Sequence, residues 1–164
     1  MLTFRKVTAQ EIIKKMNLVP HPEGGYYRET YRTGETTMTS HRKRRNLSTA
    51  IYYLLENDDK SHFHRLGSDE IWFFHQGESM EIVLISDGQE KICFLGNDID
   101  QGEVPQVIIP AGTWFAAGIK GLQGYSLVSC TVSPGFDFSD FEMADREKLI
   151  AAYPDLQEVI TAFT

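Results

Sequence analysis

Short runs of alternating hydrophobic and polar residues follow one another over most of the chain, and turn-forming pairs such as Asp87-Gly88 separate them. This alternation with a period of two is typical of half-buried strands. The pattern predicts strands at residues 26–31, 49–55, 70–75, 80–86, 91–95, 106–109, 114–119 and 125–133. Many short strands at such regular spacing indicate an all-β sandwich or barrel.

The N-terminal end of the chain has a helical pattern instead. Thr8 and Glu11 have the spacing of a capping box, and an apolar stripe of residues follows them. Asn17 and the prolines after it end this pattern. The sequence therefore predicts a helix over about residues 8–17.

The C-terminal tail, about residues 140–163, also changes to a helical pattern and contains Pro154. Because proline interrupts a helix, the tail predicts two short helices, at residues 140–153 and 155–162. The polar residues 33–46 predict a loop. With 164 residues the chain fits one domain, residues 1–164, whose barrel extends over about residues 26–133.

Two of the predicted strands do not alternate. Ile51-Tyr52-Tyr53-Leu54-Leu55 and Ile71-Trp72-Phe73-Phe74 are apolar at every position. Both faces of these strands are therefore expected to be covered. The barrel interior covers one face, and either the terminal helices or a second subunit covers the other. We expect a homodimer.

Composition and charge exclude two classes of partner. The formal net charge is −7 at pH 7, so the field of the chain repels nucleic acid and anionic membranes. No apolar run approaches the ~20 residues that span a bilayer, and the first residues lack the apolar core of a secretory signal. Cys93 and Cys130 lie in apolar stretches and are expected to be reduced core residues. These features favour a cytoplasmic protein without nucleic-acid or membrane partners.

The clearest candidate chemistry lies at His62, His64 and Glu70. Two histidines that are two residues apart on an extended chain project to the same side, and a turn at Gly67 returns the chain to Glu70. Two imidazoles and a carboxylate are donors that suit Fe²⁺, Zn²⁺ or Mn²⁺. The alternative is that the histidines are ordinary polar strand residues, one of them directed outward.

The same stretch resembles the first motif of the cupin superfamily, in which His-x-His precedes a Glu and, after six intervening residues, a Gly. Glu70 and Gly77 keep the latter spacing, whereas the gap from His64 to Glu70 is longer than in the family. Residues 110–115, PAGTWF, resemble the second motif, Pro-x-Gly-x-x-His, with Phe115 in place of the last metal-binding histidine.

Over nearly its whole length the chain resembles a subgroup of small single-domain cupins of uncharacterised function. The blocks that carry this resemblance are HPEGGYYRETYR (21–32), STAIYYLL (48–55), FHRLGSDEIW (63–72), VIIPAGTWFAA (107–117) and SPGFDFSDFE (133–142). The resemblance implies a cupin jelly-roll barrel, here with an N-terminal helix and short C-terminal helices, that usually forms dimers and has an open pocket. It implies no particular activity. With Phe115 at the last histidine position, any divalent metal cofactor is expected to bind weakly.

Metal-free acid–base catalysis, as in the cupin-like sugar epimerases, is the second chemistry that we consider. It needs a base and an acid on opposite faces of the substrate. His64 is the predicted base, with Glu70 as the second catalytic residue and a hydroxyl of Tyr27, Tyr52 or Tyr125 as a further acid. The tyrosines are otherwise core residues with a bonded hydroxyl.

Other candidate ligand-binding residues follow from strand parity and from loop positions. If Glu70 points inward, so do Trp72 and Phe74, while His75 faces out; the full predicted ligand-binding set is Trp72, Phe74, Trp114, Phe115, Tyr52, Arg45 and Asp137. Asp137 belongs to a Phe-rich loop predicted to cover the barrel mouth, or else to form only a hydrophobic clasp. Arg45 ends the basic run 41–45 and is placed at the pocket rim to hold an anionic group, although a solvated loop is the simpler interpretation of this run.

These residues leave three functions open. The first is a small-molecule enzyme, either isomerase-like without a metal or metal-dependent through His62, His64 and Glu70. The second is a ligand-binding module without turnover, and the third is a structural role. A pocket lined by aromatic side chains, with His64 and Glu70, suits a sugar-like or organic-acid ligand.

Overall fold

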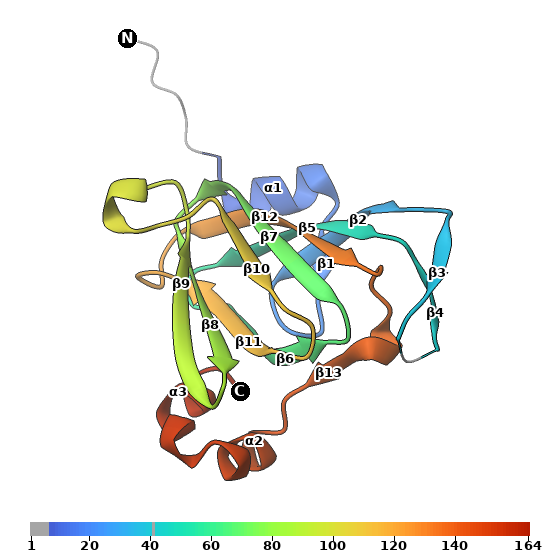
Figure 1. The fold of residues 1–164 in the computed structure, drawn as a ribbon. Coiled ribbons are helices and arrows are strands. Elements are labelled where there is room, and N and C mark those ends of the chain that lie inside the picture. Colours follow the sequence, from blue (N-terminus) through green and yellow to red (C-terminus); the bar gives the residue numbers. More distant parts are fainter. Residues whose placement is uncertain (1–6, 41) are drawn as a thin grey trace.

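Two antiparallel sheets packed face to face form the body of the computed structural model, which describes residues 7–40 and 42–164 (Figure 1). The six-stranded sheet contains, in spatial order, β1 (Val19–Pro20), β2 (Tyr26–Arg32), β5 (Thr49–Glu56), β12 (Tyr125–Ser133), β7 (Asp69–Gly77) and β10 (Gln106–Ile109). The five-stranded sheet contains β13 (Phe141–Met143), β6 (Lys60–Leu66), β11 (Trp114–Ile119), β8 (Met80–Ser86) and β9 (Gln89–Leu95). This mainly β architecture is a jelly roll, as predicted.

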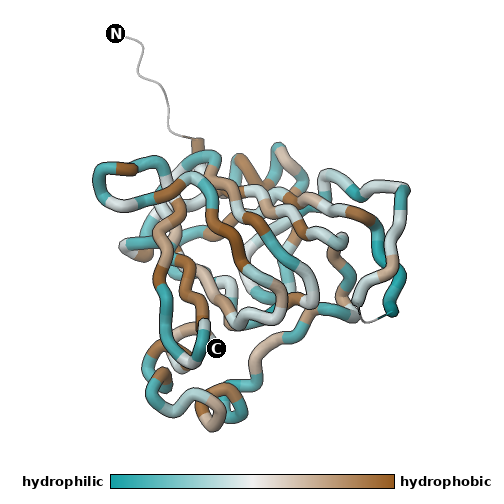
Figure 2. Tube along the Cα trace, in the orientation of Figure 1, coloured by the Kyte–Doolittle hydropathy of each residue, from teal (hydrophilic) through white to brown (hydrophobic). Residues whose placement is uncertain are grey.

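The main core lies between the two sheets and is built from the inward-facing residues of alternate positions. Tyr53 and Trp72 come from the six-stranded sheet, and Ile82 and Phe115 come from the five-stranded sheet; all four are buried. Figure 2 shows that the hydrophobic segments lie along the facing strands. The strands are thus held together by one apolar layer, which is the dominant stabilising contribution in such a fold.

Helices cover parts of both outer faces. Helix α1 (Ala9–Met16) begins with the predicted capping box of Thr8 and Glu11, and it packs Ile12 against Leu54 on the outside of β5. Helices α2 (Arg146–Ala152) and α3 (Gln157–Ala162) cover the outside of the five-stranded sheet. Among the described residues, every helix is too short or too polar to span a bilayer.

The sequence prediction needs correction at two predicted elements and at one strand that it omits. The loop expected at residues 33–46 contains a small hairpin of β3 (Thr36–Met38) and β4 (Arg44–Asn46). The helix expected at 140–153 begins only at Arg146, where Asp145 caps it, because the preceding residues form a 3₁₀ turn (Phe138–Asp140) and β13. Strand β6 was not predicted as a strand, although its residues were expected to be extended. Two further 3₁₀ turns lie at Ile99–Gln101 and Pro154–Leu156.

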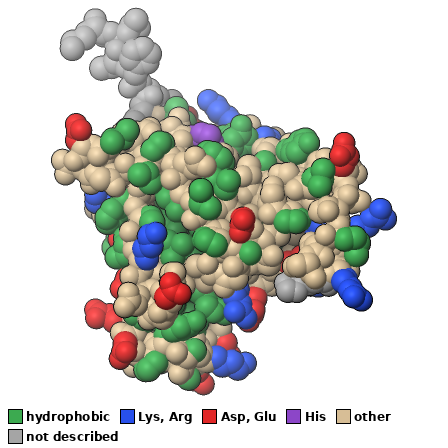
Figure 3. Space-filling view, in the orientation of Figure 1, with side chains coloured by type: hydrophobic (Ala, Val, Ile, Leu, Met, Phe, Trp, Pro, Cys, Tyr) green, Lys and Arg blue, Asp and Glu red, His purple; other side chains and the backbone are tan. Residues whose placement is uncertain are grey.

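The two strands that are apolar at every position differ in how their outer faces are covered. On β5, α1 covers the outer side chains of Tyr52 and Leu54. On β7, the outer side chains of Ile71 and Phe73 are only half buried, and Ile108 of the neighbouring β10 is 61% exposed. Figure 3 shows hydrophobic side chains exposed in the area of these two strands. An apolar face of this kind favours association.

We expect the protein to form a homodimer through the outer face of β7 and β10. Replacing Ile108 with Arg puts a charge into that face and should convert the dimer to a monomer in size-exclusion chromatography with light scattering. The matched control is Ile92→Arg on β9, the edge strand of the other sheet, where Ile92 is also exposed. A monomeric wild type at micromolar concentration contradicts this expectation.

Candidate active site

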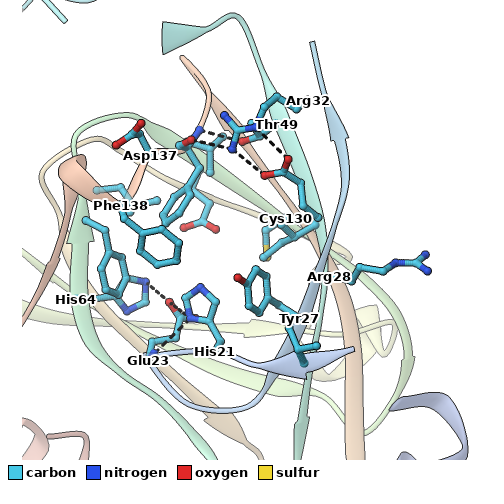
Figure 4. A pocket seen from close by; sticks show the side chains of 18 of the residues that line it. His21, Glu23, Tyr27, Arg28, Arg32, Thr49, His64, Cys130, Asp137 and Phe138 are labelled. Carbon is cyan, nitrogen blue, oxygen red and sulfur yellow. Dashed lines mark hydrogen bonds and ion pairs between the residues drawn. The ribbon is translucent and has the colours of Figure 1, made fainter. Parts of the chain in front are cut away.

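A cavity of about 450 Å³ opens between the two sheets, and residues from both sheets and from the segment after β12 line it (Figure 4). The polar lining residues include His21, Glu23, Tyr27, Glu29, Arg32, Thr49, His64, Glu70, Cys130 and Asp137. The apolar lining residues include Ile51, Leu66, Trp72, Val132, Phe136, Phe138 and Phe141. This combination of an apolar wall with a few convergent polar groups is typical of small-molecule sites.

The loop between β1 and β2 brings Glu23 into the barrel. Its two glycines have positive φ angles, 113° at Gly24 and 67° at Gly25, a conformation that glycine adopts without steric cost. A Cβ atom on Gly24 would lie 2.0 Å from the carbonyl oxygen of Lys60, so the loop can approach β6 only because Gly24 has no side chain. The Tyr53 hydroxyl donates a hydrogen bond of 2.7 Å to the Gly24 carbonyl and fixes the loop.

The carboxylate of Glu23 joins two histidines in the cavity wall. Its Oε1 accepts a hydrogen bond of 2.9 Å from the Ser61 hydroxyl. Its Oε2 lies 3.2 Å from Nε2 of His64 and 3.4 Å from Nδ1 of His21. Figure 4 shows His64, Glu23 and His21 side by side on one side of the cavity. These three residues form one ionisable cluster, and the side chains of all three are nearly buried.

The hydrogen bonds of His64 determine where its protons lie. Nδ1 lies 2.7 Å from the carbonyl oxygen of His62, which can only accept, so Nδ1 carries a proton. Nε2 faces the Glu23 carboxyl, and without a proton between them two lone pairs would face each other at 3.2 Å. His64 and Glu23 therefore share a proton, and both nitrogens of His64 are engaged.

His21 has one nitrogen engaged and one available. Its Nδ1 faces the backbone N–H of Glu23 at 3.3 Å as well as the Glu23 carboxylate. Its Nε2 makes no hydrogen bond to any residue in the described ranges. Burial lowers the pKa of His21, the charge of Glu23 opposes this shift, and His64 adds to it. The ring stands edge-on to Tyr27, with 4.5 Å between the ring centroids.

Glu70 is buried and has an unusual protonation equilibrium. Burial, first, and the nearby charge of Glu23, second, raise its pKa from 4.5 to about 8, although Trp72 and Cys130 partly oppose the shift. Its Oε2 has no hydrogen-bond partner in the described ranges, and the same is true of Nε1 of Trp72. At neutral pH Glu70 is therefore mainly a neutral carboxylic acid, and a proton donor lines the cavity.

The charged groups at the other end of the cavity are paired with one another. Arg32 donates two hydrogen bonds to Glu29, of 2.9 and 2.7 Å, and a third to the carbonyl of Phe136. Arg45 lies 2.6 Å from Asp140 and 3.8 Å from Asp137, and its hydrogen bond is the main cause that lowers the pKa of Asp140. These pairs fasten the Phe-rich segment over the cavity.

The structure brings four of the predicted site residues to the cavity, namely His64, Glu70, Trp72 and Asp137. Their functional roles remain predictions. Tyr27, one of the three tyrosines considered as an acid, also lines the cavity, whereas Tyr52 and Tyr125 pack near α1 on the outer face.

The other predicted ligand-binding residues lie elsewhere among the described residues. Phe74 packs at the margin of the main core, and Trp114 lies on the outer face near α2 and α3, with Arg65 over its ring. Phe115 is buried behind His64, with 4.1 Å between the ring centroids. Arg45 is occupied by Asp140. His41, the first residue of the basic run, lies outside the described residues.

His62 does not share the direction of His64. Strand β6 has an irregularity between Ser61 and His64, opposite Phe115 and Ala117, so the parity expected for a regular strand fails there. Nδ1 of His62 donates instead to the carbonyl oxygen of Glu23 at 2.8 Å. His75 faces away from the cavity, as predicted, and Nε2 of its ring contacts the Ser129 hydroxyl at 2.9 Å.

Comparison with known proteins identifies the family to which this architecture belongs. Residues 10–144 match the family described as Cupin superfamily (DUF985). The chain belongs to this family. It is 34% identical over 149 residues to the uncharacterized protein YML079W of Saccharomyces cerevisiae, covering 80% of this chain and 72% of that protein.

Solved structures agree with this membership. A hypothetical protein from Leishmania major has a TM-score of 0.91 at 36% identity, with 96% of this chain and 99% of that chain covered. Protein SO0799 from Shewanella oneidensis has a TM-score of 0.90 at 41% identity, with 97% and 98% covered. Oxalate decarboxylase from Bacillus subtilis, at 14% identity and a TM-score of 0.56 over 88% of this chain and 36% of that chain, shares the fold alone.

The side chains of this cupin do not fit the metal centre that the two cupin motifs imply. Phe115 holds the position of the last histidine, and His62 is directed to the backbone of Glu23. His64 has both nitrogens engaged. Among residues 7–40 and 42–164, no three His, Cys, Asp or Glu side chains are grouped to hold a metal ion. The geometry does not support the predicted metal set of His62, His64 and Glu70.

Sequence reasoning about this cupin missed His21 and Glu23 as site residues. Residues 21–25, His-Pro-Glu-Gly-Gly, are rich in proline and glycine, and this composition predicts only a turn before β2. The signal that was available is the pair Gly24-Gly25, because consecutive glycines also mark a backbone that must approach another segment closely.

The raised pKa of Glu70 predicts how the stability of this cupin depends on pH. The folded protein holds a proton on Glu70 that the unfolded chain loses near pH 4.5, so the free energy of unfolding should fall as pH rises toward about 8. Above that pH, ionisation of the buried Glu70 lowers the free energy of unfolding by an amount on the order of a few kcal/mol. Glu70→Gln keeps the shape without the ionisation and should flatten this dependence.

Thermal unfolding of wild type and Glu70→Gln between about pH 7 and 9 measures this effect. His21, Cys130 and Tyr53, whose pKa values are also shifted by folding, are present in both proteins, so the difference between the two pH profiles isolates the contribution of Glu70. Glu90→Gln, at an exposed position on β9, is the matched control and should follow the wild type. Equal pH slopes for wild type and Glu70→Gln contradict the assignment.

Proposed function

We propose that this cupin is a metal-independent enzyme that moves a proton on a small molecule bound inside the barrel. The observation that carries the proposal is the pairing of a neutral acid with a histidine–carboxylate cluster around one cavity. Glu70 holds a proton at neutral pH, while Glu23 links His64 and His21. Two groups whose environments push their proton affinities apart are what acid–base catalysis requires.

The cluster of His21, Glu23 and His64 is the proton-accepting side. His21 is the member with an open nitrogen, and Figure 4 shows its ring between Glu23 and Tyr27. Because Nδ1 accepts the backbone N–H of Glu23, the neutral ring carries its proton on Nε2, and transfer of the proton to Nδ1, beside the Glu23 carboxylate, makes Nε2 a free base. Because burial lowers the pKa of His21, the ring is neutral near pH 7 and able to accept a proton. His64 acts through Glu23, as a positioning and proton-holding residue.

Glu70 is the proton-donating side. Its carboxyl group is buried in the same cavity, on β7, and its Oε2 has no partner in the described ranges. Its raised pKa, about 8, keeps it protonated at neutral pH, so it is the acid of the pair. A substrate between Glu70 and His21 would therefore meet an acid and a base at once, which suits an isomerisation or epimerisation.

Exchange of carbon-bound hydrogen with solvent tests this function without knowledge of the product. The protein is incubated in D₂O with a panel of neutral sugars, nucleotide-linked sugars, ketones and 2-oxo acids, and loss of C–H signals is followed by proton NMR. We expect enzyme-dependent deuterium incorporation into members of one class. His21→Gln should lower its rate by at least about 100-fold, the lower range for general base catalysis.

Glu70→Gln should lower the exchange rate as well, whereas the control Glu90→Gln should not change it. Thermal shift is recorded in parallel, because a ligand at 100 times its Kd stabilises a protein by about 2.7 kcal/mol. Stabilisation by a compound without any exchange would identify a binding module and overturn the catalytic proposal.

A further inference from the structure

One hydroxyl group in the cavity wall has no partner among the described residues. Tyr27 lines the cavity, and Figure 4 shows its hydroxyl directed into the cavity. No side chain or backbone group in residues 7–40 and 42–164 forms a hydrogen bond with this hydroxyl. The hydroxyl of a half-buried tyrosine normally has a hydrogen-bond partner, so here the partner comes from a molecule in the cavity.

The other hydroxyl groups near this position are already bonded within the protein. Tyr53 lies directly opposite Tyr27 on the neighbouring strand β5, and its hydroxyl donates to the Gly24 carbonyl at 2.7 Å. Thr49, which also lines the cavity, accepts the backbone N–H of Phe136 at 2.9 Å. Of these hydroxyl groups, that of Tyr27 is therefore the one that can bind a ligand without breaking a bond of the protein.

The position of the Tyr27 ring is fixed without a ligand. Strand β2 pairs Tyr27 with Val19 of β1 on one side and with Tyr53 of β5 on the other. The ring packs against the main core, and it stands edge-on to His21 with 4.5 Å between the ring centroids. The hydroxyl is thus held beside the imidazole that we propose as the base, so that one small molecule can contact both.

We infer that Tyr27 binds the substrate by donating a hydrogen bond to a carbonyl oxygen. This inference rests on the proposed function and names its substrate class, a compound with a C–H group next to a carbonyl group. A neutral imidazole removes a proton from carbon when the neighbouring carbonyl group takes up the electron pair. A hydrogen-bond donor that is held in advance at that oxygen stabilises the charge that develops on it.

The proton balance of the step is closed. Nε2 of His21, with the ring proton on Nδ1, takes a proton from the carbon next to the carbonyl group. The electron pair of that C–H bond forms the C=C bond of an enolate, and the carbonyl π electrons move onto the oxygen that accepts the hydrogen bond of Tyr27. Return of a proton from His21 to the carbon restores the carbonyl compound without an oxidant or a further reactant. In D₂O the returning proton is replaced by deuterium.

The charges at the cavity do not restrict the ligand to one sign. Arg28 and Asp137, which carry opposite charges, both line the cavity. Arg32 also lines it and is paired with Glu29. The test therefore uses a neutral ketone and an anionic ketone that share one ring.

Cyclohexanone and 4-oxocyclohexanecarboxylate present the same cyclic ketone without and with a negative charge, and methylenecyclohexane has the shape of cyclohexanone without the oxygen. Protein labelled with ¹³C at Cζ of its tyrosines reports the hydrogen bonding of each hydroxyl by NMR. The Tyr27 resonance should move to lower field with at least one of the two ketones and not with methylenecyclohexane. The resonance of Tyr153, which packs near α2 and α3 outside the barrel, is the internal control.

Tyr27→Phe removes the hydroxyl and keeps the ring that packs against His21. In D₂O this variant should lower kcat for exchange of ketone C–H groups about 100-fold, the lower range for loss of one donor to an oxyanion, and should change KM less. The matched control is Tyr153→Phe, which should leave both constants unchanged. If Tyr27→Phe does not fold, the wild-type Tyr27 resonance, assigned through its contact with the His21 ring, decides alone.

The outcomes separate this inference from the proposed function. An unmoved Tyr27 resonance at saturating concentrations of both ketones, or no binding of either ketone, overturns the inference. Exchange at a rate that Tyr27→Phe leaves unchanged also overturns it and retains the proposed proton transfer. A shifted Tyr27 resonance without exchange in the two ketones or in any compound of the panel supports the carbonyl site and rejects the catalysis.

Discussion

The close approach of the β1–β2 loop to strand β6 is the constraint on which the site depends. It exists because Gly24 has no Cβ atom, which would lie 2.0 Å from the Lys60 carbonyl oxygen. The approach lets the Glu23 carbonyl accept the backbone N–H of His62 at 2.8 Å, so the loop is joined to the sheet as another strand would be. Glu23 is thereby inserted beside His64, and every later feature of the cavity follows from this buried carboxylate.

The raised pKa of Glu70 comes first from its own burial and second from the nearby charge of Glu23. Two carboxyl groups in one poorly hydrated cavity repel each other when both are charged, and the pair of Glu23 and His64 already holds the available countercharge. Glu70 therefore keeps its proton, and Cys130 beside it remains a thiol because burial and the two glutamates raise its pKa. The cavity therefore holds a protonated carboxyl group and a thiol beside the pair of Glu23 and His64.

The sequence predicts the parts of this arrangement that depend on regular strands. Glu70 and Trp72 share a face because β7 is regular between them, and their inward direction follows from parity alone. A strand that is apolar on both faces does not show which of its side chains point inward. For this reason the sequence predicts Tyr52 as a pocket residue, although its side chain lies on the outer face. The alternation of side chains does not predict the direction of His62, because β6 has an irregularity there that no local residue pattern indicates. The role of Glu23 depends on a contact with a strand nearly forty residues away, so a turn signal alone does not reveal it.

Phe115 packs against two residues of the cavity wall, His64 and Trp72. In the family pattern its position holds a histidine, and here the phenylalanine packs against His64 instead of offering a nitrogen. With that corner closed, the nitrogens of His64 are satisfied by the His62 carbonyl and by Glu23. A hydrogen-bonded imidazole held against a carboxylate is fixed in one orientation, as a base or its support must be. The ring of Phe115 stands edge-on to the indole of Trp72, with 6.1 Å between the ring centroids, so the residue at the family's histidine position packs against both His64 and Trp72.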